Sequence, residues 1–272
     1  MLEIKNLCYS HENGKKILNN IDFFVQDGEI LGITGKTGSG KSTLAKILNT
    51  ILRPTSGKVL LDKLNIHDEF VNPREVFFKI GLVFQHPEDH FFENTVYDEL
   101  AYGLRNKNVS ENDIQKKIYN LAEKLKLNRV FLSKSPTNIS GGEKRICAIA
   151  GILIMQPEVL ILDDPLIGLD SKNRQNLIEI LLNYHKEMQK KLIIISSSVE
   201  DILCISNKIL VLEDGKQLYF GNITKNIKKY GFELPDVTKI MSNVSIKYPN
   251  INNDVFRVQD AVLSIREVLN KR

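Results

Sequence analysis

The chain has 272 residues, 42% of them hydrophobic and 26% charged, which suits one large globular domain or one domain with a smaller appendage. Its 37 Lys and Arg residues against 33 Asp and Glu give a formal net charge of +4, spread along the chain without a block of like charge. This pattern is typical of a solvated surface and argues against a nucleic-acid-binding stripe, so we expect no nucleic-acid partner.

The cysteines and the apolar runs indicate the cellular compartment in which the chain works. Cys8, Cys147 and Cys204 are odd in number and lie far apart in apolar contexts, as expected of reduced core residues in a cytosolic protein. The chain opens with strand-like alternation and not with a signal-peptide pattern. Its longest apolar run, residues 148–155, is much shorter than the about 20 residues that span a bilayer. We therefore expect a soluble chain whose role at any membrane depends on a partner.

Strand-like and helix-like patterns alternate along the chain. Residues 1–34 read as β-structure and residues 41–52 as a helix. The other expected elements are strands at 57–62, 79–85, 159–164, 192–196 and 208–214, mostly helical chain at 94–132, and helices at 143–155 and 171–189. This alternation predicts an α/β fold with a mostly parallel sheet covered on both faces. After about residue 225 the pattern weakens into a polar tail with helical stretches at 237–245 and 258–269.

The segment GKTGSGKS, residues 35–42, matches the pattern G-x-x-x-x-G-K-[ST]. It follows an apolar strand and opens a helix, a context in which a glycine-rich backbone and a helix N-terminus cradle phosphates. Lys41 can reach the terminal phosphates, and the Ser42 hydroxyl can ligate Mg²⁺. The residues predicted to bind a nucleoside triphosphate are Gly35, Lys36, Thr37, Gly38, Ser39, Gly40, Lys41, Ser42 and Thr43.

A second strand, VLILD at residues 159–163, ends in a carboxylate. Asp163 is thereby placed at the carboxyl edge of the predicted sheet, where it can hold Mg²⁺ through water. An apolar strand ending in Asp is a weak signal alone, but together with the phosphate loop it predicts a Mg²⁺–nucleotide site.

The segment ISGGE, residues 139–143, precedes that strand by about twenty residues. Ser140 and Glu143 fit a capping box, and Gly141 and Gly142 leave N–H groups free at a helix N-terminus, which favours an anion. This arrangement resembles the signature of ATP-binding cassette (ABC) ATPases. The resemblance implies that Ser140, Gly141, Gly142 and Glu143 grip the γ-phosphate of ATP bound to the other subunit of a dimer.

Further positions match the same family. Gln85 corresponds to the Q-loop glutamine, which contacts Mg²⁺ and the attacking water and senses the transmembrane partner. Asp170 corresponds to the D-loop aspartate, which communicates across the dimer. The resemblance thus implies Ser42, Gln85 and Asp163 as the Mg²⁺ residues. His11 or Tyr9 is the candidate ring for stacking on adenine, and the family's spacing favours His11.

Within the ABC ATPases, residues 83–103, 140–165, 195–202 and 233–262 resemble the second ATPase type of energy-coupling factor (ECF) transporters, which import vitamins or transition-metal ions. The resemblance implies ATP and Mg²⁺ as cofactors and a peripheral place on the cytoplasmic face of the cell membrane. The implied partners are a second ABC ATPase, a transmembrane coupling protein and a substrate-binding membrane subunit.

The fold that this resemblance implies is an α/β P-loop NTPase with a mixed sheet, an N-terminal antiparallel β-subdomain and a helical signature subdomain. We expect an ABC ATPase domain at residues 1–225, with the helical subdomain at about 86–155. A small C-terminal region at residues 226–272 is expected to take part in dimerisation.

Two histidines invite a metal interpretation. His86 and His90 are spaced i, i+4, but Pro87 interrupts a helix between them and no third ligand lies nearby in the sequence. We therefore expect no zinc site there.

Two positions depart from the family pattern. Asp164 stands where most ABC ATPases carry a glutamate that polarises the attacking water, and a misplacement of roughly 1 Å can cost about 100-fold in rate. Ser197, in ISSSVED, stands where the family has its switch histidine. A serine hydroxyl is shorter than an imidazole and carries no positive charge at neutral pH. His185, within the preceding helix pattern, is poorly placed to substitute. Ser196 and Ser198 fit the ECF pattern.

These changes predict a site that binds MgATP but hydrolyses it slowly. The chain is then an ATPase subunit of an ECF importer, and a heterodimer with a competent sister ATPase is favoured over a homodimer. The alternative is a regulatory subunit that does not hydrolyse ATP itself and completes the site of a sister ATPase. DNA-maintenance and translation-factor ABC proteins are disfavoured, since no coiled coil, zinc module or second cassette is present in the sequence.

Overall fold

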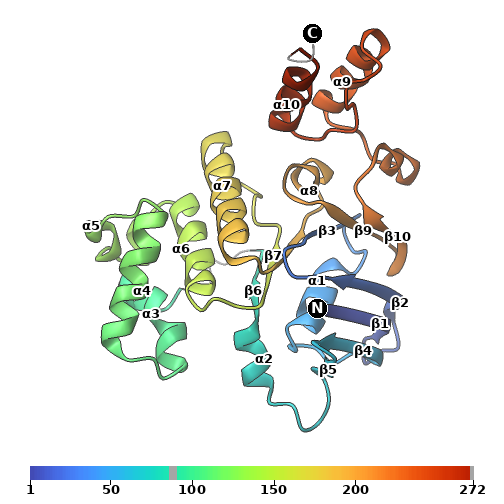
Figure 1. Cartoon of the computed structure of the whole chain (residues 1–272). Helices are drawn as coiled ribbons and strands as arrows, with labels where there is room; N and C mark the ends of the chain where they lie inside the picture. The colour runs from blue at the N-terminus through green and yellow to red at the C-terminus, as the bar shows by residue number, and fades with distance from the viewer. Residues whose placement is uncertain (86–90, 270–272) are drawn as a thin grey trace.

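The computed structural model describes residues 1–85 and 91–269, so His86 and His90 lie outside the described residues. Its elements build a central sheet flanked by helices, with a small helical lobe at the C-terminal end (Figure 1). The strands are β1 (Leu2–Ser10), β2 (Lys16–Val25), β3 (Ile30–Gly35), β4 (Ser56–Leu61), β5 (Leu64–Asn65), β6 (Ile80–Val83), β7 (Val159–Asp163), β8 (Lys191–Ile195), β9 (Lys208–Glu213) and β10 (Lys216–Asn222). The α-helices are α1 (Lys41–Leu48), α2 (Pro73–Lys79), α3 (Val96–Asn106), α4 (Glu111–Lys124), α5 (Arg129–Leu132), α6 (Gly141–Leu153), α7 (Ser171–Met188), α8 (Val199–Ile205), α9 (Asp236–Lys247) and α10 (Val258–Leu269).

The strands pair in the order β5-β4-β1-β2-β10-β9-β3-β8-β7-β6. The N-terminal part, β5-β4-β1-β2, is antiparallel, whereas β9, β3, β8, β7 and β6 run parallel to one another. The predicted mixed sheet with an antiparallel N-terminal part is confirmed. Parallel strands end at one edge, so β3, β7 and β8 deliver the phosphate loop, Asp163 and the serine triplet side by side.

The parallel strands are apolar throughout because both of their faces are buried. Ile33, Ile161 and Ile193 face one core, which α1 covers with Leu44 and Leu48. The residues that flank Ile161 and Ile193 point the other way, into a second core that α7 and α8 cover. That second core includes Leu160, Leu162, Leu192, Ile194, Leu177, Leu181 and Leu203.

Helices α3 to α6 pack around a core of their own. It contains Val96, Leu100, Leu104, Ile114, Ile118, Phe131, Ile146, Cys147 and Ala150. The C-terminal lobe is smaller still, and α9 and α10 enclose only a few buried side chains, Met241, Ile251, Val255 and Ala261. This lobe stands apart from the sheet at the top of Figure 1.

Several element boundaries differ from the prediction. The helix expected over 41–52 ends at Leu48, because the chain turns at Thr50, whose φ of 63° is left-handed. Among the described residues, the strands β5 and β10 and the helices α2 and α8 were not predicted. The start of α2 has a readable signal, since the Asn72 side chain caps the helix by accepting from the backbone N–H of Arg74 at 3.0 Å and a proline follows it.

Gly32 on β3 is required by close packing with α8. A Cβ at this position would lie 2.2 Å from Ile202 Cγ2 and 2.8 Å from Ser206 Oγ. We predict that Gly32→Ala lowers the free energy of unfolding by about 1–3 kcal/mol, measured by urea denaturation. The matched control is Gly151→Ala on α6, where a Cβ meets nothing within 4 Å and helix propensity adds up to about 1 kcal/mol. Equal stability of the two variants would contradict this packing.

Candidate nucleotide-binding site

The loop between β3 and α1 has the backbone shape that its glycines permit. Gly40, with a φ of 98°, precedes the first residue of α1, and a Cβ there would lie 2.6 Å from Leu18 Cδ2. At Gly35 a Cβ would lie 2.0 Å from the carbonyl oxygen of Leu212. Larger residues at these positions would displace the loop, so the predicted need for glycine has a structural cause.

Lys41 lies under this loop with 8% of its surface exposed. Its ammonium group donates to the carbonyl oxygens of Gly35 at 2.7 Å and Lys36 at 3.0 Å. Burial lowers the pKa of the Lys41 ammonium, and the nearby carboxylates of Asp164 and Asp163 act in the opposite direction. Ser39 offers a second donor, since its buried hydroxyl has no hydrogen-bond partner among the described residues. A buried cation beside an unpaired hydroxyl and a helix N-terminus suits a phosphate.

Asp163, the last residue of β7, has 5% of its surface exposed. Burial raises the pKa of its carboxyl, and a hydrogen bond with the Ser42 side chain acts against this shift. Mg²⁺ takes oxygen ligands and keeps several waters, and a cation here would offset the desolvation of the carboxylate. The Ser42 and Asp163 oxygens therefore fit Mg²⁺.

The two departures from the family pattern are in contact. The Asp164 N–H donates to the carbonyl oxygen of Ile195 at 2.8 Å, and the φ of Asp164 is 48°. One carboxylate oxygen of Asp164 accepts the backbone N–H of Ser197 at 3.2 Å, while the Ser197 side chain is exposed. The carboxylate and the residue at the switch position thus form one local unit. His185 lies in the last turn of α7, near Lys190 and Gly28.

The other two serines have local structural roles. The Ser198 hydroxyl caps α8 by accepting the Asp201 N–H at 3.4 Å. Ser196 is buried, and its hydroxyl oxygen accepts the Ser198 N–H at 3.1 Å. These bonds fix the turn from β8 into α8 and leave Ser197 at its tip.

The signature segment forms the predicted capping box at the start of α6. Ser140 Oγ accepts the Glu143 N–H at 3.3 Å, and Glu143 Oε2 accepts both the Ser140 N–H and its hydroxyl at 2.8 Å. These bonds from Ser140 lower the pKa of the Glu143 carboxyl. Gly141 is exposed at the helix N-terminus.

Asp170 caps α7 by accepting the Asn173 N–H at 2.9 Å. This bond is the largest cause of a lowered pKa at the Asp170 carboxyl. A Cβ at Gly142 would lie 3.1 Å from Asn173 Nδ2, so the signature segment and the start of α7 are packed together.

Gln85 lies just beyond β6 and is half-buried. Its carbonyl oxygen accepts a guanidinium N–H of Arg145 at 3.0 Å. Sequence reasoning did not single out Arg145, although a helical period places it i−4 and i−8 from the buried Ile149 and Leu153. An arginine on an apolar helix face is a signal of a buried polar role.

Tyr9 and His11 lie together near the phosphate loop. Their rings contact edge to face, with centroids 5.5 Å apart, and Tyr9 pairs across the β-ladder with Leu18. Leu18 is the residue whose side chain a Cβ on Gly40 would meet. Tyr9 packs against the core whereas His11 is exposed, so His11 is the ring available for stacking.

Comparisons with known proteins identify the family of this chain. A family model described as ABC transporter matches residues 18–167. The chain is 36% identical to the energy-coupling factor transporter ATP-binding protein EcfA2 of Clostridium acetobutylicum, over 98% of both chains. It is 37% identical to the protein of the same name from Clostridium perfringens, over 94% of this chain and 92% of that protein.

Solved structures show the same fold. The structure of cbiO1 from Clostridium perfringens, part of the ABC transporter complex cbiONQ, superposes with a TM-score of 0.77 at 29% identity, covering 91% of this chain and 95% of that one. A dimeric post-hydrolysis structure of the ATP-binding cassette MJ0796 with ADP and Pi gives a TM-score of 0.73 at 25% identity, over 82% and 98% of the chains. The chain therefore belongs to the ABC transporter ATPases. More narrowly, it is a member of the energy-coupling factor transporter ATP-binding proteins, the ATP-binding subunits of ECF-type importers.

Residues 1–85 and 91–269 contain neither a candidate membrane span nor a candidate metal cluster. No helix in these ranges has the length and apolar character to cross a membrane. Nor do these ranges hold a group of three or more His, Cys, Asp or Glu side chains placed to bind a metal ion.

The raised pKa of Asp163 gives a prediction about stability. Its buried charge lowers the free energy of unfolding as the pH rises from the ordinary carboxyl range toward the folded-state pKa, and the loss persists at neutral pH. We predict that Asp163→Asn raises the thermal midpoint of the ligand-free chain at pH 7.

The same variant loses its response to MgATP. A hundredfold excess of MgATP over its dissociation constant adds about 2.7 kcal/mol of stability to the wild type, and we expect no such gain in Asp163→Asn. Asp260→Asn, at an exposed position on α10, is the control and keeps the wild-type response. A less stable Asp163→Asn that still responds to MgATP would contradict the assignment.

Proposed function

We propose that this chain energises an ECF importer of vitamins or transition-metal ions, that its own ATP site is slow, and that it works in a heterodimer with a faster sister ATPase. The observation that carries this proposal is the contact between Asp164 and Ser197, beside an otherwise complete phosphate loop. In this proposal, residues 1–225 form the ATPase domain, and residues at about 86–155 form its helical subdomain.

Each part of the site has a role in this proposal. The backbone N–H groups of residues 35–43 hold the phosphates, Lys41 moves from the Gly35 and Lys36 carbonyls to the terminal phosphates, and the His11 ring stacks on adenine. Ser42, Asp163 and Gln85 would hold Mg²⁺, which would supply positive charge for phosphoryl transfer. Residues 140–143 meet the γ-phosphate on the other subunit, and Asp170 faces the same interface.

The slow chemistry follows from the side chains at the reacting position. Asp164 is one methylene shorter than glutamate, and one of its oxygens already accepts the Ser197 N–H. Ser197 has no ring nitrogen that could bridge the γ-phosphate and the water. The groups that hold the phosphate lie in a different segment, Ser39 in the loop after β3 and Lys41 at the start of α1, so we expect both defects to leave phosphate binding intact.

Restoring the family residues tests the proposal. We predict that Asp164→Glu with Ser197→His raises the turnover of the full-length chain by about 100-fold or more, while the dissociation constant of MgATP stays within about threefold. The two residues are in contact, so the gains of the two single variants, expressed as free energies, should not add up to the gain of the double variant.

The matched control is Ser198→Thr, which keeps the helix cap next to the switch position and should leave the turnover unchanged. An ordinary transporter turnover in the unmodified homodimer would contradict the proposal. If the double variant binds MgATP and stays inactive, the second candidate function is favoured: a regulatory subunit that completes the site of its sister. The same contact between Asp164 and Ser197 favours that candidate.

An aromatic groove beside Gln85 supports docking of a transmembrane coupling protein. Its volume is 570 Å³, and its lining includes Phe77, Phe84, Phe92 and Tyr102. Phe92 is 61% exposed and contacts Tyr102 with ring centroids 4.6 Å apart. Phe84 precedes Gln85, so an apolar helix bound in this groove would lie next to the Q-loop glutamine. We therefore assign the groove to a cytoplasmic helix of the coupling protein.

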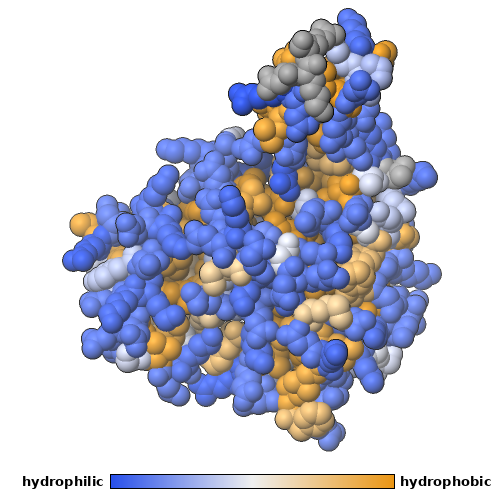
Figure 2. All heavy atoms as spheres, in the orientation of Figure 1, coloured by the Kyte–Doolittle hydropathy of each residue, from blue (hydrophilic) through white to orange (hydrophobic). Residues whose placement is uncertain are grey.

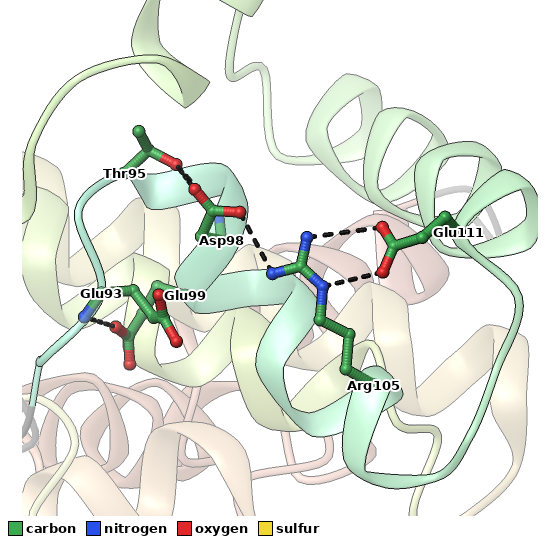
Figure 3. A network of polar contacts seen from close by, with 6 residues as sticks. All are labelled: Glu93, Thr95, Asp98, Glu99, Arg105 and Glu111. Carbon is green, nitrogen blue, oxygen red and sulfur yellow. Dashed lines mark hydrogen bonds and ion pairs between the residues drawn. The ribbon is translucent and has the colours of Figure 1, made fainter.

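Polar contacts join α3, which lines one side of this groove, to the neighbouring chain (Figure 3). Glu99, on α3, accepts the backbone N–H groups of Phe92 and Glu93 at 3.3 and 3.1 Å. Arg105 pairs with Asp98 at 3.1 Å and with Glu111 at 2.9 Å, joining α3 to α4. Burial raises the pKa of the Glu99 carboxyl, which lines the groove, so a basic residue of the docked helix would be favoured there.

The C-terminal region, residues 226–272, supports dimerisation with the sister ATPase. Val258, Val262, Ile265 and Leu269 follow i, i+4, i+7, i+11 spacing on α10 and are 68%, 40%, 37% and 59% exposed. Figure 2 shows hydrophobic side chains gathered on this lobe. Such a stripe on a small lobe suits the matching region of a second ABC ATPase.

We predict that Val262→Lys weakens association of the full chain with a second ABC ATPase by about tenfold, because one buried aliphatic side chain is worth about 1.5–3 kcal/mol. Light scattering over a concentration series measures the dissociation constant of the dimer. Glu267→Lys, an exposed position off the stripe, is the control and should leave association unchanged. Equal association of both variants would rule out α10 as the dimer surface.

A further inference from the structure

Arg145 is a buried arginine that the proposed mechanism does not use. It lies in the second turn of α6, which the signature segment opens, and only 4% of its surface is exposed. A guanidinium stays charged in proteins, so its burial requires hydrogen-bond partners. Those partners show what the side chain is for.

The guanidinium fork reaches backbone of two other catalytic segments. One nitrogen donates to the carbonyl oxygen of Gln85 at 3.0 Å. The other donates to the carbonyl oxygens of Pro165, at 3.5 Å, and Ile167. Pro165 and Ile167 lie between Asp164 and Asp170, so one side chain spans the Q-loop glutamine and the segment that links the water-polarising position to the D-loop.

The same helix touches that segment at a second point. Gly142 packs against Asn173, and Asn173 bonds through its side chain to Asp170 at 2.8 Å. Residues 165–173 are thus attached to α6 at both ends, through Arg145 and through Gly142. A shift of α6 cannot leave this segment in place without breaking hydrogen bonds to a buried charge.

We propose that Arg145 is a positioning residue that makes the signature helix, Gln85 and residues 165–170 move as one unit. This inference rests on the proposed function, in which the signature helix meets ATP on the partner and the other two segments meet ATP on this chain. Engagement of one ATP is thereby transmitted to the loops around the other. The relay has a physical basis in a rigid element with defined contacts, not in proximity alone.

Substituting lysine for Arg145 distinguishes a positioning role from simple burial of a positive charge. Arg145→Lys keeps the charge and the aliphatic stem, but a single ammonium nitrogen lacks the planar fork that reaches Gln85 and Pro165 together. If Arg145 only fills space, lysine should suffice. If it positions the two segments, lysine should uncouple them while the fold persists.

Hydrogen exchange of the full-length chain with and without MgATP tests the proposal. In the wild type, MgATP should slow exchange in residues 35–43 and, in parallel, in peptides ending at residue 85 and in residues 165–170. In Arg145→Lys, the protection of residues 35–43 and the MgATP dissociation constant should be kept, while the MgATP-induced protection of residues 165–170 falls by about 2- to 30-fold. Arg129→Lys makes the same chemical change at an exposed position on α5 and should behave as the wild type.

The outcomes are distinguishable. Unchanged protection of residues 165–170 in Arg145→Lys, with MgATP bound, overturns the inference and leaves the proposed function intact. Absence of protection in residues 35–43 of the wild type overturns both. If Arg145→Lys does not fold, a MgATP titration of the wild type tests the inference instead. Protection of the peptides ending at residue 85 and protection of residues 165–170 should then rise together, and a rise at different MgATP concentrations overturns the inference.

Discussion

The site depends on two opposite charges buried at the carboxyl edge of the parallel sheet, the Lys41 ammonium and the Asp163 carboxylate. Burial destabilises the charged form of each, as the lowered pKa of Lys41 and the raised pKa of Asp163 indicate. The ligand-free chain meets this cost with stand-in partners, the Gly35 and Lys36 carbonyls for the lysine and the Ser42 hydroxyl for the aspartate. A phosphate and a divalent cation carry charges opposite to these groups, so their binding would offset the desolvation cost of the two buried charges.

In the proposed mechanism the phosphate contacts and the two hydrolysis positions follow different strands. Lys41 and the phosphate loop follow β3, whereas Asp164 follows β7 and Ser197 follows β8. We therefore expect substitutions at Asp164 and Ser197 to slow the chemistry while the phosphate contacts of the loop after β3 remain. In the proposed asymmetric dimer, the signature capping box of this chain would offer donors to the partner's ATP while the chain's own ATP persists. In that proposed dimer, the α6 helix, which begins with the capping box and carries Arg145, would connect the two ATP sites.

Much of the site was readable from the sequence because its residues are local. The phosphate loop, the capping box of Ser140 and Glu143, and the cap at Asp170 each depend on a few consecutive residues, and their backbone contacts follow from spacing. The continuously apolar strands predicted a mostly parallel sheet, because such strands have both faces buried.

Other features depend on tertiary neighbours and were missed. Arg145 acquires its role from carbonyls 60 and 20 or more positions away, which no local pattern reports. The Asp164–Ser197 bond joins residues 33 positions apart. The helix after the phosphate loop ended early because the chain adopts a left-handed turn at Thr50, a residue type that rarely predicts one.

The most direct test of the account is a comparison of MgATP binding with single-turnover hydrolysis on the full-length chain. The account predicts saturable MgATP binding together with a hydrolysis step about 100-fold or more below the turnover of about 10 s⁻¹ that is typical of enzymes. Hydrolysis at that ordinary rate by the unmodified chain, or an absence of MgATP binding, would contradict it.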